Sequence, residues 1–241
     1  MRARGGVPSG AALLAGAALL ASILIASPAT TAQAPGATAA RPRALGLVEV
    51  PTVFGVVKGG EPSVQVVRRS RAIALRGEPS AVSPVRRTAE RPAQIEAREH
   101  GYELLSAVVY GVHEGWYRVR FLDDDEDELV WLSPGDAGSY RGLQQLLTEN
   151  PSHLTTDWDR RFHGSARRDS PTHSVRSDKA ELDVQVVRSE WVSGEMWFLV
   201  LALDPGPCAG ASEDERVVGA GWVPSHASNG EPNLWFYSRG C

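Results

Sequence analysis

Short apolar segments alternate with polar loops after residue 70, and two groups of these segments share one order. In the first group, Ala107–Tyr110 leads through Gly115 into Trp116–Phe121, and Leu129–Leu132 follows an acidic loop. Runs rich in Val and aromatic residues that Gly, Pro or Asp interrupt are typical of strands and hairpins. The pattern therefore predicts a strand, a turn, a strand, a loop and a third strand.

The second group repeats this order. Val184–Val187 leads through Gly194 into Trp197–Leu201, and Gly221–Pro224 follows a longer loop. The chain is long enough for one large domain or two small ones. The repeat favours two small β domains.

Successive side chains on a strand point to opposite faces, which divides the segment EGWYRVRF into two sets. The apolar set, which we expect in the core, is Tyr117, Val119 and Phe121. The other set, which we expect at the rim of a charged surface, is Trp116, Arg118 and Arg120.

The segments around these repeats carry weaker patterns. Residues 139–150 place Leu143, Leu146 and Leu147 at helical spacing before Pro151, which predicts a short helix packed on the first domain. Residues 45–58 are apolar enough to form a further strand docked on the body. Residues 151–178 are polar and are either a linker or part of the second domain.

The first group and its upstream segment resemble bacterial SH3-like (SH3b) domains of exported proteins. The resemblance rests on Leu75–Ser80 (LRGEPS), Gly115–Val119 (GWYRV) and Val130–Leu132 (VWL), and it covers residues 70–138. A weaker form covers residues 152–227, with GWV at 221–223. The family pattern has Gly where Val130 stands here. The resemblance implies an all-β fold of two small SH3-like, partly open β-barrels with a short connecting helix.

The N-terminus has the order of a secretory signal peptide. Arg2 and Arg4 precede the apolar run Ala11–Ala26, and small residues follow Pro28. The run is shorter than the roughly 20 residues that span a bilayer, so we expect cleavage and no stable membrane anchor afterwards; an uncleaved N-terminal anchor is the alternative. We expect a periplasmic or extracellular location.

These features predict four parts: a signal peptide at 1–39, an N-terminal extension with a docked strand at 40–69, an SH3-like domain ending in the short helix at 70–150, and a second SH3-like domain at 151–241.

The two cysteines, Cys208 and Cys241, are an even count in an exported chain, which predicts one disulfide with a single possible connectivity. It would clip the C-terminal tail to a loop of the second domain. No His or Asp accompanies Cys208 locally, which argues against a catalytic or metal-binding role.

The net charge and the absence of several sequence motifs argue against several classes of function. Without residues 1–39, which hold two Arg and no acid, the formal net charge changes from −4 to −6, which argues against nucleic acid as a partner. The chain lacks a nucleophile elbow, an H-E-x-x-H motif and a phosphate-binding loop. The six histidines lack metal-ligand spacing, and the run DDDEDE at 123–128 lacks the glycine of a calcium loop. We therefore expect no cofactor and no metal.

Tryptophans at the edge of a small barrel offer rigid contact area to extended peptides, as SH3-type grooves do. The candidate binding residues are Trp116, Arg118, Arg120, Trp131, Trp197 and Trp222. For the four tryptophans the alternative is a place in the barrel core.

The family resemblance implies a non-enzymatic module that binds a peptide, a protein or a cell-wall component of the envelope. One alternative is a small envelope hydrolase built from residues 151–178 and the segment Glu99–Glu103 (EHGYE). Another is a purely structural envelope protein whose tryptophans all lie in the core.

Overall fold

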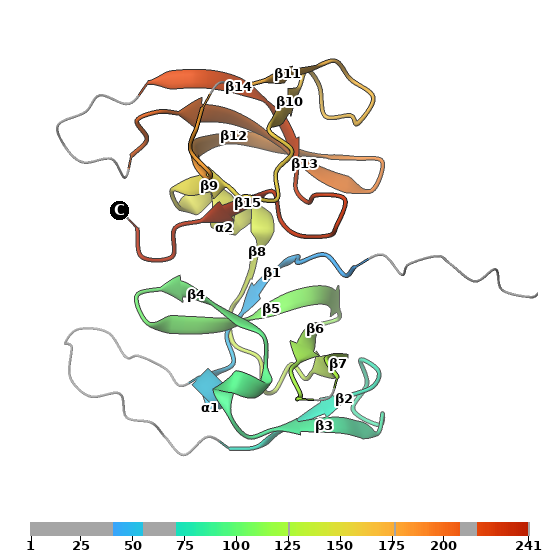
Figure 1. Cartoon of the computed structure of the whole chain (residues 1–241). Coiled ribbons are helices and arrows are strands. Elements are labelled where there is room, and N and C mark those ends of the chain that lie inside the picture. Colours follow the sequence, from blue (N-terminus) through green and yellow to red (C-terminus); the bar gives the residue numbers. More distant parts are fainter. Residues whose placement is uncertain (1–40, 55–70, 125, 176, 208–215, 241) are drawn as a thin grey trace, which may run out of the picture. The chain divides into compact units, whose positions relative to one another are not determined.

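The computed structural model describes residues 41–54, 71–124, 126–175, 177–207 and 216–240 (Figure 1). The predicted signal peptide and the predicted pair Cys208 and Cys241 lie outside these residues. No helix in the described ranges is long and apolar enough to cross a membrane.

The fold is all-β, with two antiparallel sheets. The first sheet has the strand order β3-β2-β7-β6-β5-β1-β8, and β4 also pairs with β5. Its strands are β1 (Gly46–Val48), β2 (Ile73–Arg76), β3 (Val85–Ala89), β4 (Ala97–Gly101), β5 (Leu104–His113), β6 (Trp116–Phe121), β7 (Glu128–Leu132) and β8 (Tyr140–Gly142). The end strands β3 and β8 do not pair with each other within the described ranges, so the sheet stays open.

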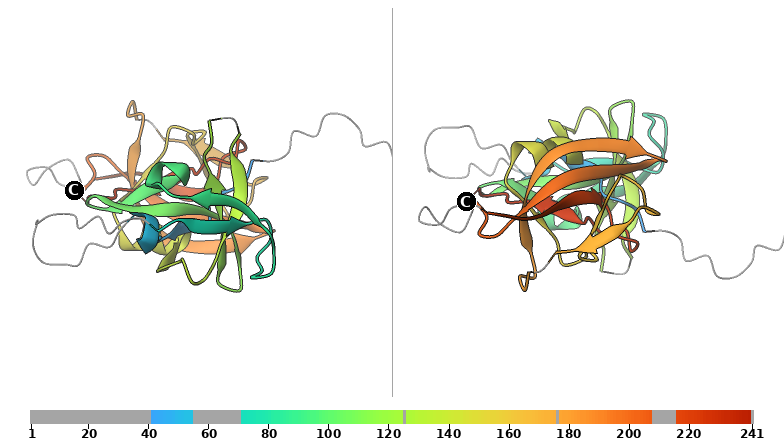
Figure 2. Two further views of the ribbon diagram at one scale, coloured as in Figure 1. Left: turned by 90° about the horizontal axis from the view of Figure 1, so that it is seen from below. Right: turned by 90° about the horizontal axis from the view of Figure 1, so that it is seen from above.

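The second sheet has the order β11-β10-β14-β13-β12-β9-β15. Its strands are β9 (Ser152–Leu154), β10 (Arg161–His163), β11 (Thr172–Ser174), β12 (Leu182–Val192), β13 (Glu195–Leu203), β14 (Val217–Pro224) and β15 (Leu234–Phe236). The long strands β12, β13 and β14 lie side by side, as the right-hand view of Figure 2 shows in orange. Because β9, β10 and β11 belong to this sheet, residues 151–178 are part of it rather than a linker.

The two repeats form β5-β6-β7 in one sheet and β12-β13-β14 in the other. Each first hairpin turns on a pair of residues with positive φ: Glu114 (46°) with Gly115 (80°), and Ser193 (52°) with Gly194 (77°). Two positive φ values are the signature of a type I′ turn, whose twist matches that of paired strands. The predicted order of elements is thus confirmed in both copies.

Two short helices join the strands, α1 (Pro51–Phe54) and α2 (Leu143–Glu149), together with a 3-10 turn at Pro92–Gln94. The segment 45–58 holds β1, which pairs with β5 as a docked strand, and then α1 in place of a longer strand. The helix predicted at 139–150 is present as α2. It contacts β1 and β8 of the first sheet but also β12 and β15 of the second, so its packing is not confined to the first domain as predicted.

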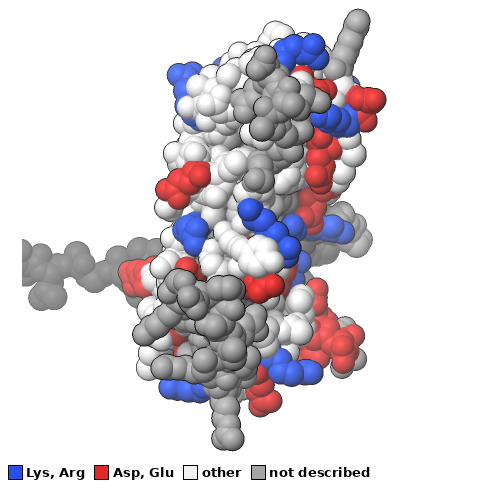
Figure 3. Space-filling view, turned by 90° about the vertical axis from the view of Figure 1, so that its left-hand side faces the viewer, with Lys and Arg blue, Asp and Glu red and all other residues white. Residues whose placement is uncertain are grey.

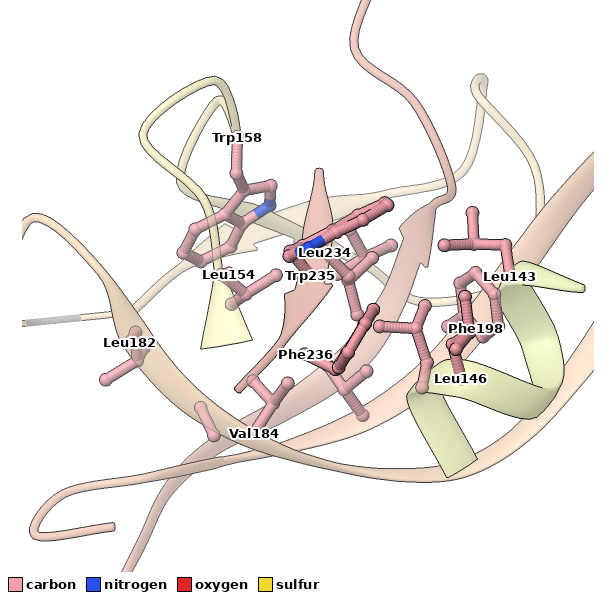
Figure 4. Close-up of a cluster of buried hydrophobic side chains, with 14 of the residues drawn as sticks. Leu143, Leu146, Leu154, Trp158, Leu182, Val184, Phe198, Leu234, Trp235 and Phe236 are labelled. Carbon is pink, nitrogen blue, oxygen red and sulfur yellow. The ribbon is translucent and has the colours of Figure 1, made fainter. Parts of the chain in front are cut away.

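The buried side chains form two large clusters. One lies within the first sheet and includes Val109, Val119 and Leu132. The other joins the three leucines of α2 to Leu154, Phe198 and Phe236 of the second sheet (Figure 4). Val108 of β5 belongs to this second cluster, whereas its neighbours Ala107 and Val109 belong to the first. Burial on both faces explains why this part of β5 is a continuous apolar run.

Candidate binding cleft

The alternation predicted for β6 is present. Val119 and Phe121 are buried, Arg118 is exposed, and Trp116 and Arg120 are partly buried. The set that contains Trp116, Arg118 and Arg120 therefore lies on the face of the first sheet that is turned away from its core.

Trp131 lies on the same face, because it pairs directly with Arg118 across β6 and β7. A Cβ at Gly111 would lie 3.2 Å from Arg118 Cβ and 3.5 Å from the Trp131 ring. Gly111 therefore leaves the space in which the indole of Trp131 lies across the sheet.

Trp197 and Trp222 are buried, at 1% and 7% exposure, in a small cluster with Ala166. Arg168 lies over the Trp197 ring at 5.8 Å, and Arg188 lies over the Trp222 ring at 5.0 Å. The structure thus places these two candidate residues in a core position, which was the alternative for them, and leaves them little surface for a partner.

Arg120 opens into a cleft of about 400 Å³ with a floor of paired strands. The Val108 amide donates to Glu96 O at 3.0 Å, and the Glu96 amide donates to Arg120 O at 2.9 Å. Arg120 in turn pairs with Leu129 of β7. Residues paired in this way share one face of a sheet, so the floor runs from Val108 through Glu96 and Arg120 to Leu129.

Two arginines of the cleft lie over aromatic rings. The Arg98 guanidinium lies 5.0 Å from the centre of the Trp235 ring, and that of Arg120 lies 4.8 Å from the Tyr110 ring. A guanidinium stacked on a ring keeps its N–H groups available at its edge, where they can bind a carboxylate in bidentate geometry. The rings therefore act as platforms that orient the arginine donors, and the Trp235 ring itself is only 8% exposed.

Tyr110 holds the middle of the floor. Its hydroxyl donates to Glu96 Oε2 at 2.6 Å, and the same carboxylate lies 3.2 Å from Arg120 Nη1. Burial and the hydrogen bond to Glu96 raise the pKa of Tyr110, so its hydroxyl stays protonated as a donor. These contacts fix Glu96 and Arg120 as a neutral pair.

The opposite wall is the connection between β14 and β15. Gly230 has a φ of 88° and lies close to the N-terminal segment 41–44, which we call the rim segment. A Cβ added at Gly230 would lie 3.0 Å from Arg41 Cβ. His226 Nε2 lies 2.9 Å from Ala44 O, which ties the rim segment to this connection. Burial is the main cause that lowers the pKa of His226 to about 4, so the ring is neutral near pH 7 and donates to Ala44 O.

The remaining charges of the cleft are unpaired within the described part of the chain. Arg41 and Arg98 have no ion pair there, and neither have Asp127 and Glu231. The cleft therefore offers free charges of both signs. Over the face seen in Figure 3, basic and acidic side chains are also interspersed rather than gathered into one basic area.

The segment Glu99–Glu103 does not converge on one point. Glu99 accepts two contacts of 3.0 Å from Arg239 Nε, whereas His100 Nδ1 lies 2.8 Å from Ser106 Oγ. His100 Nε2 lies 3.9 Å from Glu49 Oε1, so a serine, a histidine and a carboxylate lie in a row. Ser106 is 2% exposed. Its hydroxyl is thus closed to a substrate, because a nucleophile must reach the substrate in a pocket.

Among the described residues, no group of three or more His, Cys, Asp or Glu side chains is placed to hold a metal ion. Parts of the acidic run 123–128 pair with arginines instead: Glu128 with Arg86 and Arg87, and Asp123 with Arg87. These contacts join β3 to the end of β6 and the start of β7.

Comparisons with protein-family models, with curated proteins and with solved structures found no match for this chain. Of the candidate residues named from the sequence, the cleft contains Arg120 alone. The sequence analysis missed Arg41, Arg98, Tyr110 and Trp235. The apolar run Leu234–Phe236 is typical of a strand. No pattern in the neighbouring sequence predicts the contact between Trp235 and Arg98.

Proposed function

We propose that this chain is an exported, non-enzymatic binding protein built of two SH3-like modules, and that its cleft binds a short extended peptide of the cell envelope. Export rests on the signal-like N-terminus. The SH3-like assignment rests on the motifs in residues 70–138, and it is supported by the two repeats lying in two separate sheets.

The observation that carries the proposal is the pair of stacked arginines, Arg98 on Trp235 and Arg120 on Tyr110, within one cleft. Trp235 is only 8% exposed, so its ring serves as a platform that orients Arg98. The edges of the oriented arginines bind carbonyl or carboxylate oxygens. A volume of about 400 Å³ is at the small end of ligand sites, which favours a short segment over a folded surface.

Affinity selection with random tetrapeptide pools tests the proposal. The purified full chain is mixed with a pool, and the retained peptides are identified by mass spectrometry. Arg98→Gln keeps an aliphatic stem over Trp235 but removes the charge. We expect the wild type to retain a subset of peptides, and Arg98→Gln to weaken that retention about tenfold, as expected for the loss of one charge-assisted hydrogen bond.

Arg118→Gln is the matched control. Arg118 is exposed, has no ion pair within the described ranges and lies on the same face as Arg120, but it does not line the cleft. We expect it to bind as the wild type does. No retention by the wild type, or a loss with Arg118→Gln but not with Arg98→Gln, would contradict the proposed cleft.

A further inference from the structure

The floor of the cleft is flanked by two free charges of opposite sign, Arg98 and Asp127. Arg98 belongs to β4, two residues beyond Glu96, and lies over Trp235. Asp127 lies at the other side, two residues before Leu129 of β7. From Glu96 the floor continues to Arg120 and then to Leu129, which is two strand spacings of about 4.8 Å each. Arg98 and Asp127 therefore lie on opposite sides of Arg120 along the floor.

The middle of the floor carries no free charge. Arg120 and Glu96 neutralise each other at 3.2 Å, and Tyr110 donates to the same carboxylate. A ligand that crosses the floor thus meets a free cation at one end, a neutral centre with an aromatic ring, and a free anion at the other end. Arg41 and Glu231, which also line the cleft, add one further free charge of each sign.

We infer that the cleft selects peptides of three to four residues with both ends free, the carboxylate bound at Arg98 and a positively charged group facing Asp127. An extended chain rises about 3.4 Å per residue, so three to four residues span about 10–14 Å. A chain of this length is long enough to cross the two strand spacings from Glu96 to Leu129. The inference rests on the proposed function, because it assigns the orientation and end chemistry of the peptide in the same cleft.

Four tetrapeptide pools test the inference: one with both ends free, one with amidated carboxyl ends, one with acetylated amino ends and one with both ends blocked. Binding of each pool is measured by calorimetry with the full chain. We expect the pool with free ends to bind best and each single block to weaken binding about tenfold, since each removes one charge-assisted contact.

Two variants test which residue of the cleft binds each end of the peptide. Arg98→Glu should abolish the preference for free carboxylates and favour amidated peptides, while Asp127→Asn should abolish the preference for free amino ends. Arg118→Gln should keep both preferences. A thermal melt shows that each variant is folded.

The outcomes separate the two proposals. If the wild type binds the doubly blocked pool as well as the free pool, and Arg98→Gln still weakens binding, the end selectivity is wrong while the peptide-binding cleft stands. If the preferences are present but Arg98→Glu leaves them unchanged, the assigned orientation is wrong. If no pool binds, the proposed function itself is wrong.

Discussion

Trp116 and Trp197 lie in the second strand of their repeats, one and three residues after the turn glycine, and they differ in burial. Trp197 is 1% exposed and packs edge-on against His163 at 5.1 Å, whereas Trp116 is partly exposed on the face opposite the core. Replacing a core tryptophan with alanine removes its burial and leaves a cavity. We expect Trp197→Ala to lower the free energy of unfolding by about 3–5 kcal/mol, and Trp116→Ala by about 1 kcal/mol.

Urea denaturation of both variants measures this difference. Equal losses of stability would show that Trp116 contributes to the core as Trp197 does. Wild-type stability of Trp197→Ala would contradict the burial of that ring.

His226 makes stability depend on pH. Its Nδ1 lies 2.8 Å from Ser225 Oγ and its Nε2 lies 2.9 Å from Ala44 O. The pKa of His226 is lowered to about 4, mainly by burial and also by the charge of Arg43. The hydrogen bond to Ala44 and the charge of Glu195 act in the opposite direction. An unfolded histidine titrates near 6.5, so the unfolded chain takes up this proton first as the pH falls.

The contribution of His226 is therefore fully present above about pH 6.5 and is lost between about pH 6.5 and pH 4, by up to about 3 kcal/mol. Urea denaturation at several pH values compares the wild type with His226→Gln. We expect a smaller fall in stability for the variant across this range. Parallel curves for the two proteins would show that His226 does not carry the effect.

The helix α2 depends on one apolar face. Leu146 is 0% exposed and packs with side chains of the second sheet, whereas the exposed side chain of Gln145 donates to Glu149 Oε1 at 3.0 Å. A helix of seven residues has little stability of its own, so tertiary packing holds it. We expect Leu146→Ala to cost about 2–5 kcal/mol and Gln145→Ala less than about 0.5 kcal/mol.

Thermal melts with calorimetry measure both variants of α2. A small effect of Leu146→Ala would contradict the packing of this helix against the second sheet.

The elements with a local signal could be predicted from the sequence. The two hairpins could be predicted from the alternation of apolar and polar side chains and from one glycine each. Gly115 and Gly194 adopt a positive φ in the I′ turns. Strands β9, β10 and β11 were not predicted, since each has three residues and no clear alternation.

The cleft could not be predicted in the same way. Residues 94–96 form hydrogen bonds with both β5 and β6. Arg98 lies over the ring of Trp235, which is more than 130 residues away in the sequence. These are long-range pairings that no local pattern encodes. The resemblance predicted an aromatic binding groove, but it centred that groove on Trp116 rather than on Arg98 and Trp235.

One of the two large apolar clusters contains residues of both sheets. Leu47 of β1 and Val108 of β5, both from the first sheet, pack in the same cluster as Phe198 and Leu234 of the second. Residues 39–241 accordingly form one compact unit. Because opening either sheet would expose this common cluster, we expect one cooperative unfolding transition for the two sheets together.

Differential scanning calorimetry measures this cooperativity. The calorimetric and van't Hoff enthalpies should agree, and Leu146→Ala should shift the whole transition. Two resolved transitions, with only one shifted by Leu146→Ala, would show that the sheets unfold independently.

The central claim is that the cleft lined by Arg98, Arg120 and Trp235 is the binding surface. Nuclear magnetic resonance with the isotope-labelled full chain and the tetrapeptide pool with free ends measures this most directly. We predict shifts of the Trp235 indole N–H signal and of the amides of Arg98, Arg120 and Glu231. Shifts confined to Trp116, Arg118 and Trp131, or no shifts at millimolar peptide, would contradict the account.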